Sequence, residues 1–264
     1  MSHVDSRLNR LKLNAEKAEL LWAGSRHSAA VLGNKGPSAK LGQDTVVPSN
    51  HVGVLGVTFS SDLSLDDHVT RVSATCFYWL RQLRRVRRSL DDDAMKTLVR
   101  VFVTSRVHYC NAVLAGSPKS TTDTLQRVLN AAARLVSNTH KYDRGLSSLL
   151  HDHLHWLDVP EQVEYKLAVM VRRCLENKAP KYLSVHCTPV TAVSSRHLRS
   201  ANQRQLTVQR CRKITHGRRA FSVAGPAVWN SLPTEFRDLS VSFDDFRCAR
   251  KTILFARVSG EQNV

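Results

Sequence analysis

The sequence predicts a mainly α-helical protein with a small β-rich unit at its start and a loosely structured basic region at its end. Three observations support this: short apolar runs separated by turns in the first sixty residues, helical spacing of apolar residues from Asp66 onward, and weaker periodicity after Pro180. With 264 residues and 42% hydrophobic content, the chain can bury a substantial core. We therefore expect three parts, residues 1–62, 63–180 and 181–264.

Strands and turns are predicted for the first part. The apolar run at residues 17–23 ends at a Gly-Ser pair, and a second short segment covers residues 44–47. Residues 52–59 are rich in β-branched side chains that Gly53 and Gly56 interrupt, which is typical of a strand with a turn. The unit is too short to be a domain by itself.

The first expected helix has two different faces. An apolar face is predicted from Phe77, Leu80 and Leu83. The residues that line another side, at spacings i, i+3, i+4 and i+7, are Arg81, Arg84, Arg85 and Arg88. We call these four residues the arginine stripe, and expect one helix to contribute both to the core and to a cationic surface.

Three further helices are expected in the middle part. The carboxylates at residues 91–93 suit the first turn of a helix that is apolar nearly all round and should be central in the core. Its apolar residues are Met95, Leu98, Val99, Val101, Phe102 and Val103. Pro118 and Pro160 open the next two helices, and residues 146–150 form a short helical piece between them. Their predicted core residues are Leu125, Val128, Leu129, Ala132, Leu135 and Val136, then Val163, Leu167, Met170 and Cys174.

The third part is expected to have little regular structure before its last helix. Alternation of Leu206 and Val208 suggests a short strand, and the Gly-Pro pair at 225–226 is interpreted as a turn before the last helix. Ser242 and Asp245 form a capping box for the last helix.

Cationic charge dominates the composition. The formal net charge is +17 and the pI is near 10.2, which indicates nucleic acid as a partner more than an anionic membrane or an acidic protein. Between Glu176 and Glu235 there is no Asp or Glu, and we call residues 177–234 the acid-free segment. Its ten cations are Lys178, Lys181, Arg196, Arg199, Arg204, Arg210, Arg212, Lys213, Arg218 and Arg219. They form either a solvated basic face or a site for a polyphosphate.

Other functional classes are less well supported. The apolar runs are too short to span a bilayer and the start is too polar for a signal peptide, so a nuclear or cytoplasmic location is expected, with six reduced cysteines. A zinc site at His151, His153 and His155 is disfavoured, because alternate residues share a face only on a strand. A two-metal polymerase or nuclease site is also disfavoured, because the carboxylate groups at 66–67, 91–93 and 244–245 fall at expected helix N-termini, where dipole and capping roles explain them. We expect no cofactor and no metal site.

Six short motifs occur in a fixed order. They are LNAEKAE at 13–19, LGV at 55–57, TSRVHYCN at 104–111, NAAARL at 130–135, LHWL at 154–157 and FSVAGPAVWNSLP at 221–233. In this order they resemble the C-terminal part of a reverse transcriptase of the non-LTR, LINE-type (jockey-like) retrotransposons. The resemblance covers residues 8–255. It implies a palm edge, a thumb and a post-thumb region.

The resemblance also implies roles for particular residues. Lys17 corresponds to the lysine of the palm-closing motif, which lies near the phosphates of the incoming nucleotide, although Ala18 replaces the family's threonine. Leu55, Gly56 and Val57 are similar to the primer grip. The family's catalytic aspartates, which bind Mg²⁺, lie upstream of the segment at 13–19. We therefore expect the chain alone to lack polymerase activity and to give no product in a primer-extension assay.

Two functional hypotheses follow, and a third possibility stays open. The first is a truncated reverse transcriptase fragment that binds RNA, DNA or their hybrid through the backbone. Its expected contacts are Arg81, Arg84, Arg85, Arg88, Arg196, Arg199, Arg204, Arg210, Arg212, Lys213, Arg218 and Arg219. The second is a host-adopted helical interaction module that binds an acidic protein. The third is an active enzyme completed by a separate chain that supplies the palm.

Overall fold

The chain is divided into two compact units, Met1–His68 and Val69–Val264, in the computed structural model. The structure describes residues 17–24, 36–41, 44–140, 142–193, 203–211 and 217–260. Most of the described elements are helices, and small two-stranded hairpins precede them, as the sequence predicts. No described helix is both long enough and apolar enough to cross a membrane.

The first unit contains two antiparallel hairpins. Strands β1 (Ala39–Leu41) and β2 (Asp44–Val46) form one, and β3 (His51–Val54) and β4 (Val57–Ser60) form the other. The segment at 17–24 is tied to them, because the Glu19 carboxylate accepts a hydrogen bond of 2.7 Å from the Gly53 amide. The β-rich start predicted from the sequence is therefore confirmed.

The β3–β4 hairpin has a two-residue turn at its tip. Val54 pairs with Val57, so Leu55 and Gly56 are the two turn residues, and their φ angles are 48° and 80°. Two successive positive φ angles define the type I′ turn that matches the twist of a hairpin. Glycine adopts this conformation readily, whereas leucine does so at a cost. Leu55 is nevertheless 83% exposed at the tip.

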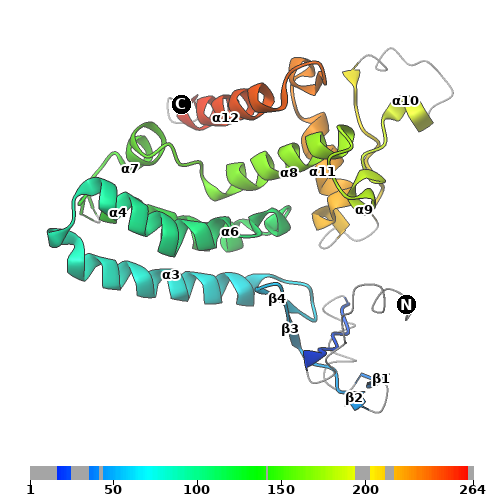
Figure 1. Ribbon diagram of the computed structural model, residues 1–264, viewed down its shortest axis with the longest axis horizontal. Helices are drawn as coiled ribbons and strands as arrows, with labels where there is room; N and C mark the ends of the chain where they lie inside the picture. The colour runs from blue at the N-terminus through cyan, green and yellow to red at the C-terminus, as the bar shows by residue number, and fades with distance from the viewer. Residues whose placement is uncertain are drawn as a thin grey trace. The chain divides into compact units, whose positions relative to one another are not determined.

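The second unit is a set of packed helices (Figure 1). Helix α3 (Asp66–Val86) begins at the boundary of the units, and α4 (Asp92–Val99) follows. A π-helical turn, Arg100–Thr104, joins α4 to the short α5 (Ser105–His108). Helix α6 (Lys119–Val136) packs against both α4 and α8 (Val159–Leu175). All three helices predicted after the first are therefore present.

Shorter elements connect and follow these helices. Between α6 and α8 lie α7 (Leu146–Ser148) and a second π-helical turn, Leu149–His153. After α8 come α9 (Lys181–Ser184), α10 (Val190–Val193), α11 (Phe221–Asn230) and α12 (Phe243–Gly260). Helices α11 and α12 both pack against α8. The predicted capping box of α12 is confirmed, because Ser242 Oγ accepts a hydrogen bond of 3.1 Å from the Asp245 amide.

The core of the second unit begins around α4 and α6. Met95, Val99 and Val103 have no exposed surface, and every predicted core residue of α6 is buried. Arg87, which follows α3, donates hydrogen bonds to the carbonyls of Leu135 and Val136 at the end of α6. Because those carbonyls have no partner within the helix, Arg87 serves as a C-terminal cap from a distant segment.

A second apolar cluster lies where α8, α11 and α12 meet. Trp229 of α11 is fully buried and lies 6.0 Å, centroid to centroid, from the ring of Phe246 on α12. The Gly-Pro pair at 225–226 was predicted to form a turn before the last helix, but it lies inside α11 and is buried. The small Gly225 allows close packing, since an added Cβ would be 3.1 Å from Val171 of α8. Tertiary packing therefore overrides the local signal for a turn.

Three other local predictions were wrong. Phe77 was placed in the core but is 39% exposed, and Val69, Cys76, Leu80 and Leu83 form the buried face of α3 instead. Val101 was expected in a helix at the centre of the core but is 58% exposed, so one side of the segment after α4 faces solvent. The predicted strand at 206–208 is reduced to a single bridge between Pro189 and Leu206, and Val208 is exposed.

Candidate anion-binding surfaces

The arginine stripe is exposed along its whole length. Arg81, Arg84 and Arg85 lie on α3, and Arg88 lies in the 3₁₀ turn that follows. Among the described residues none of the four forms an ion pair with a carboxylate. The four arginines therefore lie on the surface of this helix and the turn after it, as their spacing predicts. Their charges are available to an external anion.

Aromatic side chains extend the same surface. Phe77 and Tyr78 are 39% and 49% exposed. Phe77 lies four residues before Arg81, and Tyr78 lies seven residues before Arg85, so each shares a helix face with part of the stripe. Their exposure is unfavourable in water but suits stacking on planar groups. We call these two aromatic residues and the arginine stripe together the α3 surface.

Arg87 lies within the same basic run but has a different role. Its side chain is mostly buried, and it donates to the carbonyls of Leu90, Leu135 and Val136 and pairs with the Asp92 carboxylate. The helical spacing correctly leaves Arg87 out of the stripe. Only the tertiary contacts show that this arginine is structural.

In the acid-free segment the structure describes only part of the predicted contact set. Arg196, Arg199, Arg212 and Lys213 lie outside the described residues. Arg210 and Arg218 are exposed, and Arg219 is half-buried. The remaining residue, Arg204, does not need an external partner, because it pairs with the carboxylate of Asp238 from beyond the segment. A hydrogen bond from the Ser240 amide, together with Arg204, lowers the pKa of Asp238 to about 2.

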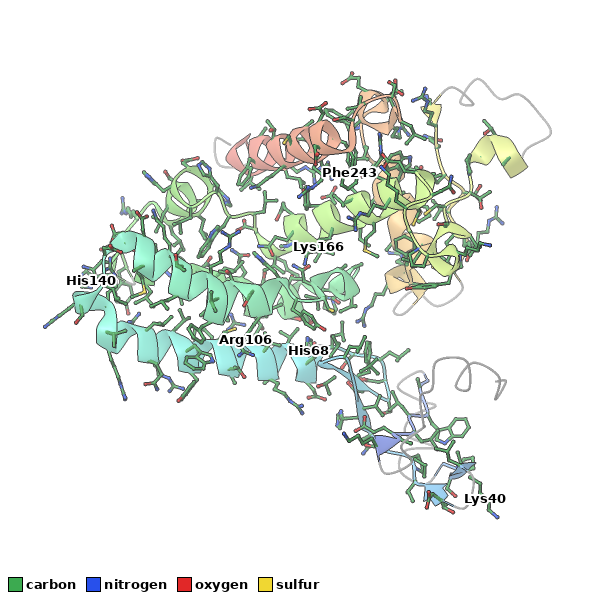
Figure 2. All side chains as sticks on the ribbon, viewed as in Figure 1. Lys40, His68, Arg106, His140, Lys166 and Phe243 are labelled. Atoms are coloured by element: carbon green, nitrogen blue, oxygen red, sulfur yellow. The ribbon has the colours of Figure 1, made fainter. Side chains whose placement is uncertain are left out.

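The first cation of the acid-free segment also has partners within the protein. Lys178 pairs with Glu176 at 2.9 Å and lies 6.0 Å from the centre of the Phe243 ring at the start of α12 (Figure 2). Arg173 and Arg247 lie 5.6 and 5.8 Å from the same ring. The negative face of an aromatic ring attracts such cations. The folded chain therefore supplies some of the counter-charge that the sequence alone assigned to a partner.

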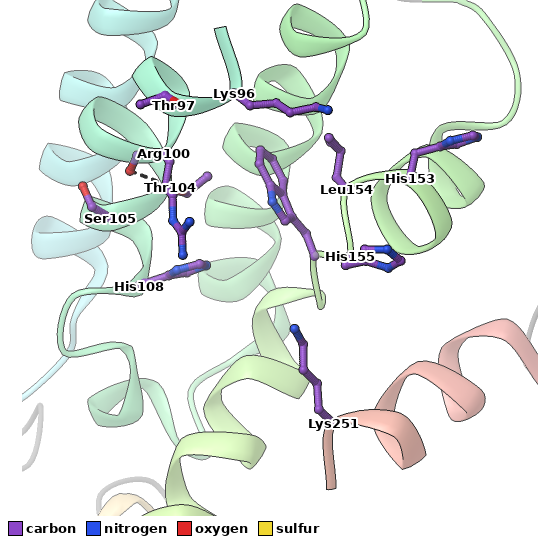
Figure 3. A pocket seen from close by; sticks show the side chains of 11 residues that line it. Lys96, Thr97, Arg100, Thr104, Ser105, His108, His153, Leu154, His155 and Lys251 are labelled. Carbon is purple, nitrogen blue, oxygen red and sulfur yellow. Dashed lines mark hydrogen bonds between the residues drawn. The ribbon is translucent and has the colours of Figure 1, made fainter. Parts of the chain in front are cut away.

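A basic cavity between α4 and α12 is the site that the sequence did not predict. Its volume is about 530 Å³. Three separate segments line it: residues 96–108, residues 153–156 and Lys251 of α12. The lining residues are Lys96, Thr97, Arg100, Thr104, Ser105, His108, His153, Leu154, His155, Trp156 and Lys251 (Figure 3). Asp and Glu are absent from this set.

The imidazole of His108 is neutral in this cationic setting. Burial, together with the nearby charges of Lys166 and Arg100, lowers the pKa of His108 to about 4. Lys166 of α8 donates a hydrogen bond to the His108 carbonyl, and burial lowers the pKa of this lysine as well (Figure 2). His108 can therefore exchange hydrogen bonds at neutral pH without adding charge to the cavity.

The alternating histidines do not act together. His151 is buried, its Nδ1 lies 2.9 Å from the Trp156 carbonyl, and its Nε2 lies 3.6 Å from the carboxylate of Asp158. His153 and His155 instead line the basic cavity. Within the described ranges no three His, Cys, Asp or Glu side chains are grouped to hold a metal ion.

The remaining predicted residues lie in the first unit. Lys17 is exposed at the start of the described segment 17–24. Leu55 and Gly56 form the tip of the β3–β4 hairpin, and Val57 is buried at the start of β4.

Comparisons with protein-family models, curated proteins and solved structures found no match for this chain.

Proposed function

We propose that this chain binds nucleic acid through its phosphate backbone, and that the α3 surface is the main contact. The observation that supports the proposal is the combination of four exposed arginines without a carboxylate partner among the described residues and two exposed aromatic side chains on the same helix. Arginine attracts phosphate and aromatic rings stack on bases, so this combination suits RNA, DNA or their hybrid.

The sequence resemblance supports the same role. In that resemblance the helices from Asp66 onward, which begin with α3, are similar to the thumb of non-LTR retrotransposon reverse transcriptases, and the thumb of that family grips the template and product duplex. We propose that this chain derives from such a reverse transcriptase. The role proposed for residues 63–180 is gripping nucleic acid rather than catalysing synthesis.

The dependence of affinity on salt tests the proposal. Binding of a fluorescent 20-base-pair duplex should weaken steeply as salt rises, because each phosphate contact adds about 0.9 to the slope of log affinity against log salt. The double variant Arg84→Ala/Arg85→Ala should reduce that slope by about 1.8. The matched control is Lys119→Ala/Arg127→Ala, which removes two exposed cations from α6 and should leave the slope nearly unchanged.

The two outcomes are distinct. An affinity that does not depend on salt, or an equal loss in both double variants, would contradict the proposal. Competition separates it from binding to an acidic protein, since an excess of unrelated RNA should displace the duplex. If RNA leaves a bound acidic protein in place, the interaction module is the better description.

A further inference from the structure

The basic cavity collects permanent cations from different segments. Lys96 comes from α4, Arg100 from the first π-helical turn, and Lys251 from α12. In Figure 3 the side chain of Arg100 extends toward His108, that of Lys96 extends toward Leu154, and that of Lys251 extends from α12 into the cavity. Of the described carboxylates only Asp93 pairs with one of them, at 3.3 Å from Lys96, and Asp93 itself is 91% exposed. The cavity therefore has an excess of positive charge.

Each hydroxyl group in the cavity wall donates its hydrogen bond to a carbonyl of its own helical segment. The hydroxyl of Thr97 donates to the Asp93 carbonyl at 2.9 Å, that of Thr104 to the Arg100 carbonyl at 3.2 Å, and that of Ser105 to the Val101 carbonyl at 2.5 Å. Each oxygen retains lone pairs after this donation. The three oxygens can therefore act as acceptors toward a ligand. The wall thus combines cationic donors for an anion with oxygen acceptors for hydroxyl or amino groups.

A second hollow of about 240 Å³ adjoins the first. The two share His108, His155, Trp156 and Lys251. The second hollow adds Leu157, Gln162, Tyr165 and Lys166, so it brings an apolar and an aromatic side chain beside two polar ones. A cationic chamber next to an aromatic one matches a ligand with a phosphate at one end and a planar ring at the other.

The local backbone is irregular around the cavity. Both π-helical turns, Arg100–Thr104 and Leu149–His153, contribute residues to its wall. His155 has a φ angle of 52°, in the left-handed region that is rare for histidine. Such departures from regular geometry occur frequently at binding sites, because they place side chains that a regular helix could not.

We propose that this pair of cavities binds a nucleotide, with its phosphate at the cationic wall that contains Arg100 and Lys251 and its base against the wall that contains Trp156. The site is separate from the α3 surface, and the proposal does not require that surface to bind nucleic acid. The nucleotide comes either from free solution or from the phosphorylated end of a strand, and the phosphate and base chemistry is the same in both.

Titration with ATP tests the proposal. Arg100→Ala and Lys251→Ala should each weaken ATP binding about tenfold, as expected for loss of a charge-assisted hydrogen bond. Lys251→Arg should retain most of the affinity. The charge-matched controls Lys119→Ala and Arg127→Ala, which remove exposed cations of α6 outside both sites, should bind ATP as the original chain does. Arg100 and Lys251 are both exposed, so the variants should keep the fold, and circular dichroism should verify this.

The base is tested separately from the phosphate. Trp156→Leu should weaken ATP binding by about fivefold or more, while binding of inorganic triphosphate should change little. Absence of saturable ATP binding up to about 1 mM would overturn the proposal, as would equal losses in the cavity and control variants.

The source of the nucleotide is identified with oligonucleotides in the Arg84→Ala/Arg85→Ala background. If a 5′-phosphorylated strand binds there more tightly than the same strand without phosphate, and Lys251→Ala removes the difference, a strand end is the ligand. If the phosphate makes no difference and ATP still binds, the free nucleotide is the ligand. Failure of the duplex experiment on the α3 surface leaves both of these results unaffected.

Discussion

Arg250 on α12 and Glu164 on α8 form an ion pair in which the arginine side chain is only 1% exposed. The two residues are 86 positions apart in the sequence. Arg257, about two turns further along the same face of α12, binds the other oxygen of the same carboxylate at 2.9 Å. Burial lowers the pKa of Arg250, and the charge of Glu164 opposes that shift. The last helix is therefore held to the core by electrostatics as well as by apolar packing.

Removal of the carboxylate should destabilise the protein strongly. Glu164→Gln leaves the buried guanidinium of Arg250 without a counter-charge, and we expect the free energy of unfolding to fall by about 3 kcal/mol. Arg257→Ala removes the more exposed partner of the same carboxylate and should cost less than about 1 kcal/mol. Urea denaturation followed by circular dichroism measures both, and equal losses would mean that burial of Arg250 is not decisive.

The turn at the tip of the β3–β4 hairpin should be improved by a residue that tolerates positive φ. Leu55→Asn creates the Asn-Gly pair favoured in type I′ turns, and we expect stabilisation by about 0.5–1 kcal/mol. Gly56→Ala should have the opposite effect, because it adds a Cβ at a φ of 80°. Hydrogen exchange of the β3 and β4 amides reports on this hairpin directly. A slower exchange in the alanine variant would contradict the assigned turn.

Glu161 at the start of α8 should make stability depend on pH. Burial raises the pKa of this carboxyl group, and the neighbouring Asp158 and Glu164 raise it further, although its backbone hydrogen bond and Arg257 oppose the shift. Its Oε2 atom is buried and has no hydrogen-bond partner among the described residues. A carboxyl group whose pKa is higher in the folded than in the unfolded state favours folding at low pH and disfavours it once both states are ionised.

The substitution Glu161→Gln should therefore raise the melting temperature at pH 7.5. The difference from the original chain should shrink as the pH falls through the folded-state pKa and should vanish below the unfolded value of about 4.3. Differential scanning calorimetry between pH 4 and pH 8 provides the measurement. Glu235→Gln, at an exposed position, is the control and should show little change over the same range. A larger benefit at pH 4 than at pH 7.5 would refute this explanation.

Strong local periodicity made the helices of the second unit predictable. In α6 the apolar residues from Leu125 to Val136 follow one helical face, and all of the predicted ones are buried. The prediction of Phe77 as a core residue failed because helical spacing alone allows two neighbouring faces, and the packing partner decides which of them is covered. Helix α11 was missed because its Gly-Pro pair is a local signal for a turn, whereas the packing of Gly225 against Val171 of α8 depends on the fold.

The candidate surfaces differ in the same way. The arginine stripe was visible in the sequence because its four residues lie on one helix. The basic cavity was not, because Lys96, Arg100, Trp156 and Lys251 belong to segments as many as 155 positions apart. The alternating histidines were noticed, but only the fold shows that His151 is structural while its two neighbours line the cavity.

The sequence by itself determined the helical class, the positions of the main helices and the cationic face of α3, because each depends on the period and charge of one continuous segment. Only the tertiary structure decided which cations are free to meet a partner. Arg204 pairs with a carboxylate and Arg87 caps a distant helix, whereas Arg100 and Lys251 line an open cavity and have no carboxylate partner among the described residues. The physical reason is that the electrostatic energy of a charged side chain depends on its distance from opposite charges and dipoles. The fold, rather than spacing in the sequence, sets those distances.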